Sequence, residues 1–334
     1  MAGKDSVEKL EDVIVRSAEQ ISGNIRAARE AISTVIFGQQ RVVENALVTI
    51  LSGGHALLIG VPGLAKTKLV ETLGITLGLD AKRVQFTPDL MPSDILGAEV
   101  LDESAAGKRS FRFIAGPVFA QLLMADEINR ASPRTQSALL QAMQEQHITV
   151  AGARHDLPKP FHVLATQNPL EQEGTYPLPE AQLDRFLMEI DVEYPDREAE
   201  RKILFDTTGA DQTVAKAAMT TDTLITAQRL VRRLPVGDSV VEAILSLVRS
   251  ARPGDEGGDT GKLIAWGPGP RASQALMLAV RARALLDGRL APSIDDVIEL
   301  AEPILKHRMA LTFAARAEGE TIVNVIAKLK ARIG

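Results

Sequence analysis

The first 195 residues combine helix-periodic segments with short apolar runs. Apolar residues recur at helical spacing from Val13 to Ile36 and from Gln40 to Leu51, which predicts two amphipathic helices. Five short apolar runs, several of them separated by helical segments, predict a sheet of buried parallel strands with helices on both faces. These runs are His55–Ile59, Arg83–Phe86, Gln121–Ala125, Phe161–Ala165 and Leu187–Ile190. The expected fold class of this part is α/β.

The pattern changes after Pro195, where strand signals vanish. A chain of 334 residues exceeds what one core usually serves. We therefore expect a second, smaller and all-helical domain over residues 196–334. Its predicted helices are Arg197–Phe205, Thr223–Val231, Ser239–Ser250, Ala272–Leu286, Ile294–His307 and Thr321–Ala331.

Composition narrows the classes of function. No cysteine is present, which excludes disulfides and thiolate metal sites and favours a cytoplasmic location. The longest apolar runs fall well short of about 18 residues, so membrane insertion is not expected. A formal net charge of −5 and an aromatic content of 4% argue against a nucleic-acid binder, because such proteins present basic surfaces and stacking side chains.

The stretch that begins at Gly60 follows an apolar run and opens a helix-like segment, which is the setting of a phosphate-binding loop. In such a loop Lys66 would reach the β and γ phosphate oxygens, and the hydroxyl of Thr67 would hold Mg²⁺. Gly60 and Gly63 could supply the positive φ angles of a tight loop. Ala65 replaces the usual last glycine, and we expect the helix start to tolerate its β-carbon. A Gly/Pro turn without a ligand is the alternative.

A later apolar run ends in two acids, Asp126 and Glu127. In doubly wound sheets ligands bind beyond the carboxyl ends of the strands, so both acids are expected near the Mg²⁺ and the γ-phosphate. Asp126 would contact the metal directly or through water, and Glu127 would orient and deprotonate the attacking water. The alternative is a strand end capped by solvated acids, and the presence of the phosphate-binding loop in the same sequence disfavours it.

Two further polar positions could complete the site. Asn168 follows the next predicted strand and could hydrogen-bond the attacking water or the γ-phosphate, although an Asn-Pro turn explains it as simply. Arg185 precedes the last predicted strand. Charge in the transition state of phosphoryl transfer favours an arginine supplied from outside the pocket, but Asp184 and Arg185 could equally form a surface ion pair. These residues alone leave both alternatives open.

The order of these motifs resembles that of AAA+ ATPases, and more narrowly that of the MoxR family, over about Val35 to Arg308. The most specific parts are the loop Gly60–Thr67, where alanine before the lysine is a habit of the family, and Asp126–Ala131. The segments Gln136–Met143, Ala165–Pro169 and Gly267–Ala272 are also typical. The resemblance implies a P-loop NTPase core of the AAA+ type over residues 1–195 and an all-helical lid over residues 196–334.

The resemblance also implies roles for single residues. Asn168 would be the sensor 1 residue, Arg185 the finger that reaches the ATP of a neighbouring subunit, and Arg271 the sensor 2 residue at the start of a lid helix. The segment Ile36–Gln39 would lie against the adenine. The implied nucleotide-binding residues are Gly38, Gln39, Gly60, Pro62, Gly63, Leu64, Ala65, Lys66, Thr67, Lys68 and Asp126, with Thr67 and Asp126 at the metal.

Two insertions are implied by the same resemblance. Residues 88–119 resemble the helix 2 insertion, with a hairpin through Gly107 and Lys108, and residues 146–160 resemble the hairpin before sensor 1. In rings of this type both insertions can face the central pore or a partner. Arg130 and Arg134 are expected near the subunit interface, with a solvated helix face as the simpler reading for Arg134.

The function implied is an ATPase that uses Mg²⁺, assembles into a homo-oligomeric ring, expected to be a hexamer, and remodels, matures or activates partner proteins. Proteins with von Willebrand factor A domains are the expected clients. Because Arg185 would complete a neighbour's pocket, hydrolysis would depend on assembly. Other classes remain open: a nucleic-acid motor, which the acidic charge disfavours; a nucleotide-gated binding module; and a chelatase-like motor subunit, which would need a tetrapyrrole-binding companion.

Overall fold

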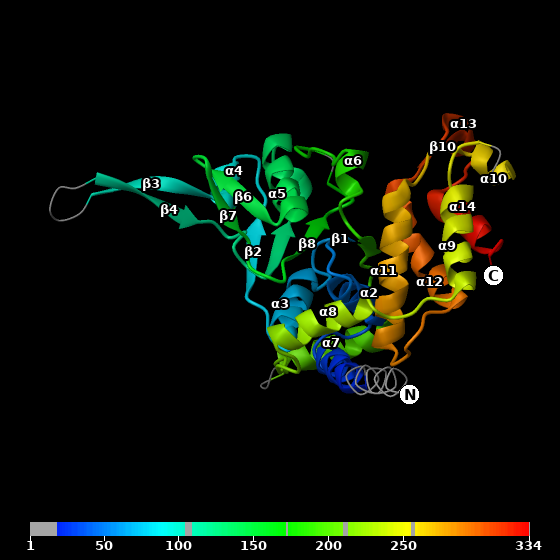
Figure 1. The fold of residues 1–334 in the computed structure, drawn as a ribbon, viewed down its shortest axis with the longest axis horizontal. Coiled ribbons are helices and arrows are strands. Elements are labelled where there is room, and N and C mark those ends of the chain that lie inside the picture. Colours follow the sequence, from blue (N-terminus) through cyan, green and yellow to red (C-terminus); the bar gives the residue numbers. More distant parts are fainter. Residues whose placement is uncertain (1–18, 104–108, 172, 210–212, 255–257, 334) are drawn as a thin grey trace, which may run out of the picture.

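The computed structural model describes residues 19–103, 109–171, 173–209, 213–254 and 258–333. A sheet with its helices lies beside a second group of helices, and a long hairpin projects from the sheet side (Figure 1). The predicted N-terminal helix is present over residues 19–33, and its expected beginning before residue 19 lies outside the described part.

Five parallel strands form the central sheet in the order β2-β5-β8-β1-β9. Each strand overlaps a predicted apolar run, so the predicted α/β class is confirmed. One expectation was wrong: β2 is not buried, because it lies at the edge of the sheet and four of its five residues are exposed. The strands are β1 (Ala56–Ile59), β2 (Ala81–Gln85), β5 (Leu122–Asp126), β8 (His162–Gln167) and β9 (Met188–Asp191).

The helices on this side of the molecule occur before, between and after the strands. The predicted helix Gln40–Leu51 is confirmed with the same bounds as α2. Helix α5 begins sharply at Pro133, because proline favours the first helical position and Ser132 caps the helix by accepting a hydrogen bond from the backbone N–H of Thr135. The other helices are α3 (Lys66–Leu77), α4 (Pro92–Leu96), η1 (Ile128–Arg130), α5 (Pro133–Glu145), α6 (Glu180–Leu183), α7 (Arg197–Thr208) and α8 (Thr221–Val231).

Alternate residues of the strands enter two different cores. Leu58 and Met124 belong to the apolar cluster that contains α2 and α3, whereas Leu57 and Leu123 belong to the cluster that contains α5. Successive side chains of a strand point to opposite faces, so both faces of the sheet are covered by helices. Each fully buried leucine contributes about 1.5–3 kcal/mol. The prediction of helices on both faces is therefore confirmed.

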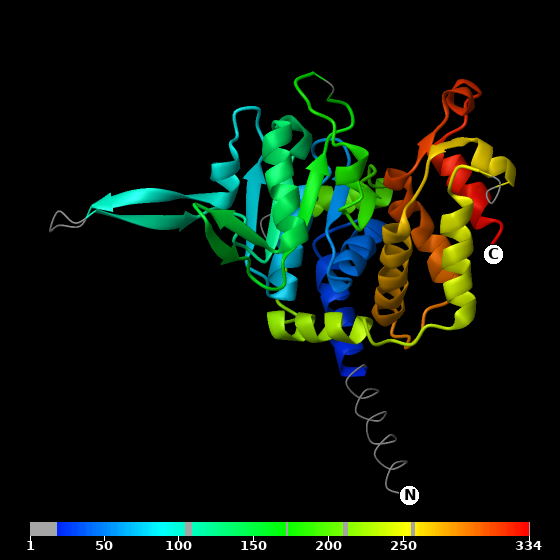
Figure 2. The same ribbon diagram turned by 45° about the horizontal axis from the view of Figure 1, so that its top comes forward.

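Both predicted hairpins are present. Strands β3 (Gly97–Glu103) and β4 (Arg109–Ala115) pair antiparallel and form the projecting arm, whose predicted turn at Gly107 and Lys108 lies outside the described residues (Figures 1 and 2). Strands β6 (His147–Val150) and β7 (Ala153–Asp156) form the second hairpin. The hairpins touch each other, because the rings of Phe113 and His155 stack with their centroids 3.9 Å apart.

The second group of helices follows α8. The expectation that this region is wholly helical needs one correction, because two short extended segments, β10 and β11, pair antiparallel and satisfy each other's backbone groups. None of the helices in the described part of the chain has the length and apolar composition needed to cross a membrane. The elements are α9 (Asp238–Ser250), α10 (Gly258–Lys262), β10 (Ile264–Trp266), α11 (Pro270–Leu286), α12 (Ile294–Leu305), η3 (Lys306–Arg308), β11 (Ala310–Leu311), α13 (Phe313–Ala317) and α14 (Ile322–Lys330).

Helices α7 and α8 belong spatially to the sheet side. In the turned view α8 runs beneath the sheet and its helices (Figure 2). The backbone N–H groups of Ala218 and Met219, just before α8, donate to the carbonyl of Thr76 at 2.9 and 3.0 Å. The predicted domain boundary near residue 196 stays a prediction, since the chain turns toward the second helical group only after α8.

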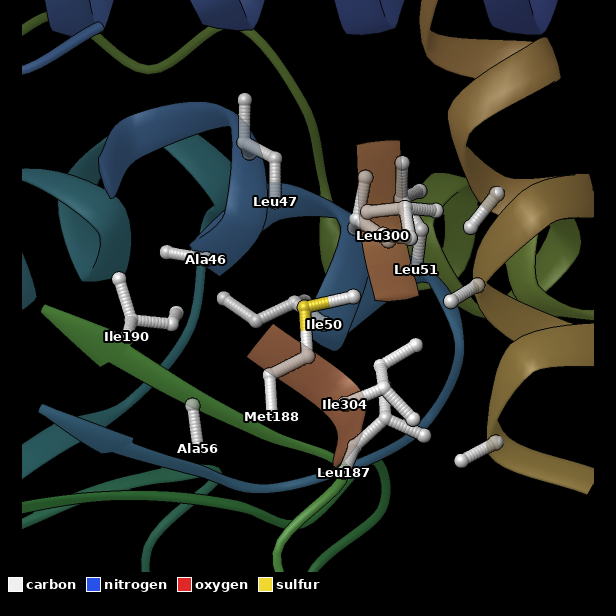
Figure 3. Close-up of a cluster of buried hydrophobic side chains, with 14 of the residues drawn as sticks. Ala46, Leu47, Ile50, Leu51, Ala56, Leu187, Met188, Ile190, Leu300 and Ile304 are labelled. Carbon is white, nitrogen blue, oxygen red and sulfur yellow. The ribbon is translucent and has the colours of Figure 1, made fainter. Parts of the chain in front are cut away.

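One apolar cluster joins the sheet to the second helical group. Helix α2 lies between them, with its side chains packed on strands β1 and β9 on one side and on α12 on the other (Figure 3). This shared core holds the second group against β9, beside the end of the sheet. The labelled members are Ala46, Leu47, Ile50, Leu51, Ala56, Leu187, Met188, Ile190, Leu300 and Ile304.

Candidate active site

The loop between β1 and α3 lies at the carboxyl edge of the sheet. Gly63 has φ +85°, as predicted, whereas Gly60 does not use a positive φ. Glycine is needed at position 60 for another reason: a β-carbon there would lie 2.7 Å from the carbonyl O of Val192. Ala65 lies at the start of α3, as expected, but it has φ +56° and the left-handed conformation, which the expectation did not include. A β-carbon in that region costs about 1–2 kcal/mol.

Lys66 begins α3 and folds back into the loop. Its Nζ donates to the carbonyl O of Gly60 and, at 3.1 Å, to that of Val61. Burial lowers the pKa of Lys66, while the nearby charges of Asp126 and Glu127 act in the opposite direction. The ammonium group therefore lies within the loop and close to both acids.

Asp126 ends β5 and is almost fully buried. Its Oδ1 accepts a hydrogen bond from the hydroxyl of Thr166 at 2.5 Å. Its Oδ2 accepts from Nη2 of Arg83 at 2.6 Å and from Nε of the same side chain at 3.1 Å. The carboxylate is thus held by two neighbouring strands, β8 and β2.

Glu127 follows in a left-handed conformation, with φ +55°. Its Oε2 accepts from Nε2 of Gln85 at 2.6 Å and from Nη1 of Arg130 at 3.0 Å. Arg130 also donates to Glu171 at 3.1 Å, so it joins Glu127 to an acid that does not line the cavity described below. Arg134 is exposed on α5, which both a solvated helix face and a subunit interface predict.

A cavity of about 450 Å³ collects these groups at the carboxyl edge. The structure therefore brings together the phosphate loop, both acids and Asn168, which is buried at the end of β8 and accepts a hydrogen bond from the backbone of Leu170. Arg83 and Gln85 also line it and were missed; their signal is a pair of polar residues two apart on a strand that ends at this edge. The lining residues are Pro62, Gly63, Leu64, Ala65, Lys66, Thr67, Lys68, Arg83, Gln85, Asp126, Glu127 and Asn168.

A second cavity, of about 410 Å³, shares the residues Gly63, Leu64, Ala65 and Lys68 with the first. Gln39 lines it and ties it to the loop, because its Nε2 donates to the carbonyl O of Leu64 at 3.2 Å. Its Oε1 is buried without a hydrogen-bond partner among the described residues. Gly38 does not line this cavity: a β-carbon at Gly38 would meet Ala199 of α7 at 2.3 Å.

The mixed lining of this second cavity suits a nucleobase, which has apolar faces and a polar edge. Val35, Ile36 and Ile203 supply apolar surface, and the free Oε1 of Gln39 could accept a hydrogen bond from an exocyclic amine. The geometry thus agrees with the expectation that Ile36–Gln39 lies against adenine, except at Gly38.

The other two predicted site residues lie elsewhere. Arg185 and Arg271 line a cavity of about 310 Å³ together with Gly54 and His55, which precede β1. This is the amino edge of the sheet, because Ala56 pairs with Met188 at the starts of β1 and β9. Arg185 and Arg271 do not line either of the two cavities described above at the carboxyl edge.

Contacts across long sequence distances hold the amino edge together. Nη1 of Arg271 lies 3.5 Å from Oδ2 of Asp184, and Nε of Arg308 donates to Oδ1 of the same residue at 2.8 Å. Arg308 is buried and also donates to the carbonyl groups of Phe186 and Leu187. Arg308 thus fixes the segment that carries Arg185, while the Arg185 side chain stays partly exposed.

The residues at the carboxyl edge fit Mg²⁺ and a nucleoside triphosphate. The Thr67 hydroxyl and the Asp126 carboxylate are oxygen ligands of the kind that Mg²⁺ prefers. The start of α3 offers free backbone N–H groups beside Lys66 for phosphate oxygens. Nothing within 4 Å fills the space beside Gly63, where a phosphate chain would pass.

A parallel sheet with a phosphate loop after β1, acids after β5 and a polar residue after β8 defines a AAA+ ATPase. Comparisons with known proteins agree with this class. The model of the ATPase family associated with various cellular activities matches residues 55–188, and the model of the AAA lid domain matches residues 259–329.

The chain belongs to the MoxR family of these ATPases. It is 42% identical to the chaperone MoxR1 of Mycobacterium tuberculosis over 92% of this chain and 82% of that protein. It is 32% identical to the MoxR protein of Paracoccus denitrificans over 90% of this chain and 93% of that protein. The crystal structure of a candidate ATPase from Cytophaga hutchinsonii superposes with a TM-score of 0.87 at 35% identity and covers 97% of both chains.

Proposed function

We propose that this protein hydrolyses ATP within a ring of identical subunits, expected to be a hexamer in the cytoplasm, and uses the cycle to remodel, mature or activate partner proteins. The observation that carries the proposal is the separation of the site into two edges of one sheet. Binding groups and both acids share one cavity at the carboxyl edge, whereas Arg185 and Arg271 share another at the amino edge.

At the carboxyl edge each side chain has a role that its position supports. Lys66 and the start of α3 would bind the phosphates, and Thr67 and Asp126 would hold Mg²⁺. When bound, the metal ion supplies positive charge that offsets charge on the phosphate oxygens. Glu127 would orient a water molecule and accept its proton, and Asn168 would hydrogen-bond the same water or the γ-phosphate.

At the amino edge the two arginines would serve a neighbouring subunit. A head-to-tail contact between copies sets the amino edge of one sheet against the carboxyl edge of the next, and repeated contacts of this kind close into a ring. Arg185 and Arg271 would then both approach a neighbour's phosphates and stabilise charge in the transition state. This modifies the usual picture of sensor 2, since Arg271 lines the same cavity as Arg185 and does not line the cavity of its own loop.

The partner class follows from the family. A relative that is named a chaperone supports a protein client, and we propose proteins with von Willebrand factor A domains as that client. The two hairpins in contact through Phe113 and His155 are surfaces on which a client could act.

The test is the Glu127→Gln variant. We expect ATP affinity within about twofold of the wild type and turnover lower by about 10²-fold or more, because the base that accepts the proton is lost. In ATP this variant should retain a client that the wild type releases. Glu171→Gln is the matched control, since it removes the other carboxylate bound by Arg130. Unchanged turnover in Glu127→Gln would refute the assigned role.

A further inference from the structure

The edge strand β2 places a guanidinium group in the proposed metal site. Arg83 and Gln85 are two residues apart on β2, so their side chains share one face of the strand. Both line the cavity that contains the phosphate loop. The register fixes where they lie, because Gln85 pairs with Asp126 and Arg83 pairs with Met124 on the neighbouring strand.

The contact between Arg83 and Asp126 uses one of the two carboxylate oxygens that could bind a cation. Nη2 and Nε of Arg83 both donate to Oδ2 of Asp126, at 2.6 and 3.1 Å, and Oδ1 accepts from Thr166 at 2.5 Å. A carboxylate oxygen has two lone pairs, so both sites on Oδ2 are taken. Oδ1 keeps one lone pair beside its hydrogen bond from Thr166, so Arg83 occupies one of the two oxygens with which Asp126 could meet a metal ion, and its positive charge opposes a second cation at the other.

The two partners differ in exposure. The side chain of Arg83 is 51% exposed, whereas that of Asp126 is 12% exposed. The acid is held in the cavity by Thr166, but the arginine can leave toward solvent on the open side of the edge strand. Exchange of the guanidinium for another cation requires movement of this one exposed side chain.

We propose that Arg83 competes with Mg²⁺ for Asp126 and so sets how strongly nucleotide binding depends on the metal. The proposal rests on the proposed function, because it assigns the metal to Asp126. Without metal, Arg83 neutralises the acid next to the phosphate site. With metal, the guanidinium is displaced and the two cations exclude each other at one oxygen.

Removal of the Arg83 charge should weaken nucleotide binding without metal and strengthen the binding of Mg²⁺. In Arg83→Gln the unpaired carboxylate repels phosphates when no metal is present, so nucleotide affinity in EDTA should fall. The same carboxylate is available to Mg²⁺ without competition, so the half-saturating Mg²⁺ concentration should fall about fivefold, the effect of a partly exposed charge pair. Arg83→Lys should lie between the two, because it keeps the charge and loses the two-pronged contact.

The experiment measures equilibrium binding of a fluorescent, non-hydrolysable ATP analogue in EDTA and across a Mg²⁺ titration. Direct binding of Mn²⁺ in the presence of the same analogue, followed by electron paramagnetic resonance, is the second readout. Lys82→Gln is the matched control: it removes one positive charge at the adjacent position, whose Nζ donates to the carbonyl of Phe119 and does not line the cavity. We expect Lys82→Gln to stay within about twofold of the wild type.

Three results separate the possibilities. A lower half-saturating Mg²⁺ in Arg83→Gln, with Lys82→Gln near the wild type, supports the competition. An unchanged or higher value, or an equal shift in both variants, overturns it while the proposed ATP site stands. A wild type that binds no analogue with or without Mg²⁺ overturns the ATP site as well. If Arg83→Gln does not fold, Arg83→Lys decides in the same way.

Discussion

The two edges of the central sheet are built in different ways. At the carboxyl edge one continuous loop, Gly60–Thr67, supplies most of the binding groups, and strands β5 and β8 add an acid pair and an amide. At the amino edge Arg185 depends on Asp184 and Arg308, which are 124 residues apart in sequence. A single chain therefore carries the phosphate loop in a cavity at one edge and Arg185 and Arg271 in a separate cavity at the other.

The edges also differ in their charge balance. The cavity at the carboxyl edge is lined by Lys66, Lys68 and Arg83 together with two acids, so positive charges exceed negative ones by one before nucleotide binds. The amino edge pairs a single acid, Asp184, with the side chains of both Arg271 and Arg308. The excess of positive charge there is suited to an anion brought by another molecule.

Substitutions at the two edges should affect different quantities: ATP turnover at the amino edge and ATP affinity at the carboxyl edge. Arg185→Ala should lower ATP turnover by about 10³-fold, the range of an arginine finger, while the affinity for ATP stays within about twofold. Lys66→Ala should instead lose affinity, because its ammonium lies in the binding loop. Turnover and binding of a fluorescent analogue check both variants, with Arg134→Ala as an exposed-arginine control. A large loss of affinity in Arg185→Ala would contradict the division between the edges.

Acid should weaken the amino edge, where three buried histidines lie. Burial lowers the pKa of His55 to about 3 and of His162 to about 4, and burial also lowers the pKa of His307, whose Nε2 contacts the carbonyl of Phe186. Below pH 6.5 the unfolded chain binds protons that the folded histidines do not bind, so stability is present at neutral pH and falls as the pH decreases toward 4.

At pH 5 His55 and His162 should each lower the free energy of unfolding by about 2 kcal/mol relative to neutral pH, and His307 should act in the same direction. Urea denaturation at pH 7.5 and pH 5 measures the difference. His162→Gln should remove the contribution of His162 to this pH-dependent loss of stability. Glutamine can still donate to the carbonyl of Gly54 and accept from Gln228, so the contacts of the folded state are kept. Equal stability at the two pH values would show that the amino edge does not depend on neutral histidines.

Much of the fold could be predicted from the sequence because apolar periodicity reports which faces are buried. The helix Gln40–Leu51 follows its apolar periodicity, and strands β1, β5 and β8 are short runs of mainly buried residues. The position of β2 at the edge could not be predicted in this way, because strand order is set by packing between distant segments. Arg83 and Gln85 were therefore missed as site residues.

The site was predicted where a motif is local and missed where it depends on backbone geometry. The loop, Asp126, Glu127 and Asn168 occupy one cavity, as expected from strand ends that meet at one edge. The left-handed conformation of Ala65 was not predicted because helix propensity says nothing about a left-handed residue before the helix. Gly38 does not line the second cavity, and a β-carbon there would meet Ala199 of α7, a neighbour about 160 residues away in sequence that no local motif indicates.

Substitutions of Ala65 test the backbone strain in the loop. Ala65→Gly should raise the free energy of unfolding by about 0.5–1 kcal/mol, since glycine accepts φ +56° without a β-carbon clash and offsets this only partly by its freer unfolded state. Ala65→Val should lower stability, because a β-branched residue is disfavoured there. Chemical denaturation of both variants tests this; a less stable Ala65→Gly would contradict the strain assigned to the loop.

The most direct test of the two-edge account mixes Lys66→Ala with Arg185→Ala. Each variant alone should be nearly inactive, but random co-assembly leaves about a quarter of the interfaces with an intact loop on one side and an intact arginine on the other. We predict that an equal mixture recovers about that fraction of wild-type turnover, while Lys66→Ala mixed with Glu127→Gln, both at the carboxyl edge, recovers none. Activity of the first mixture no greater than the sum of its parts would contradict the account.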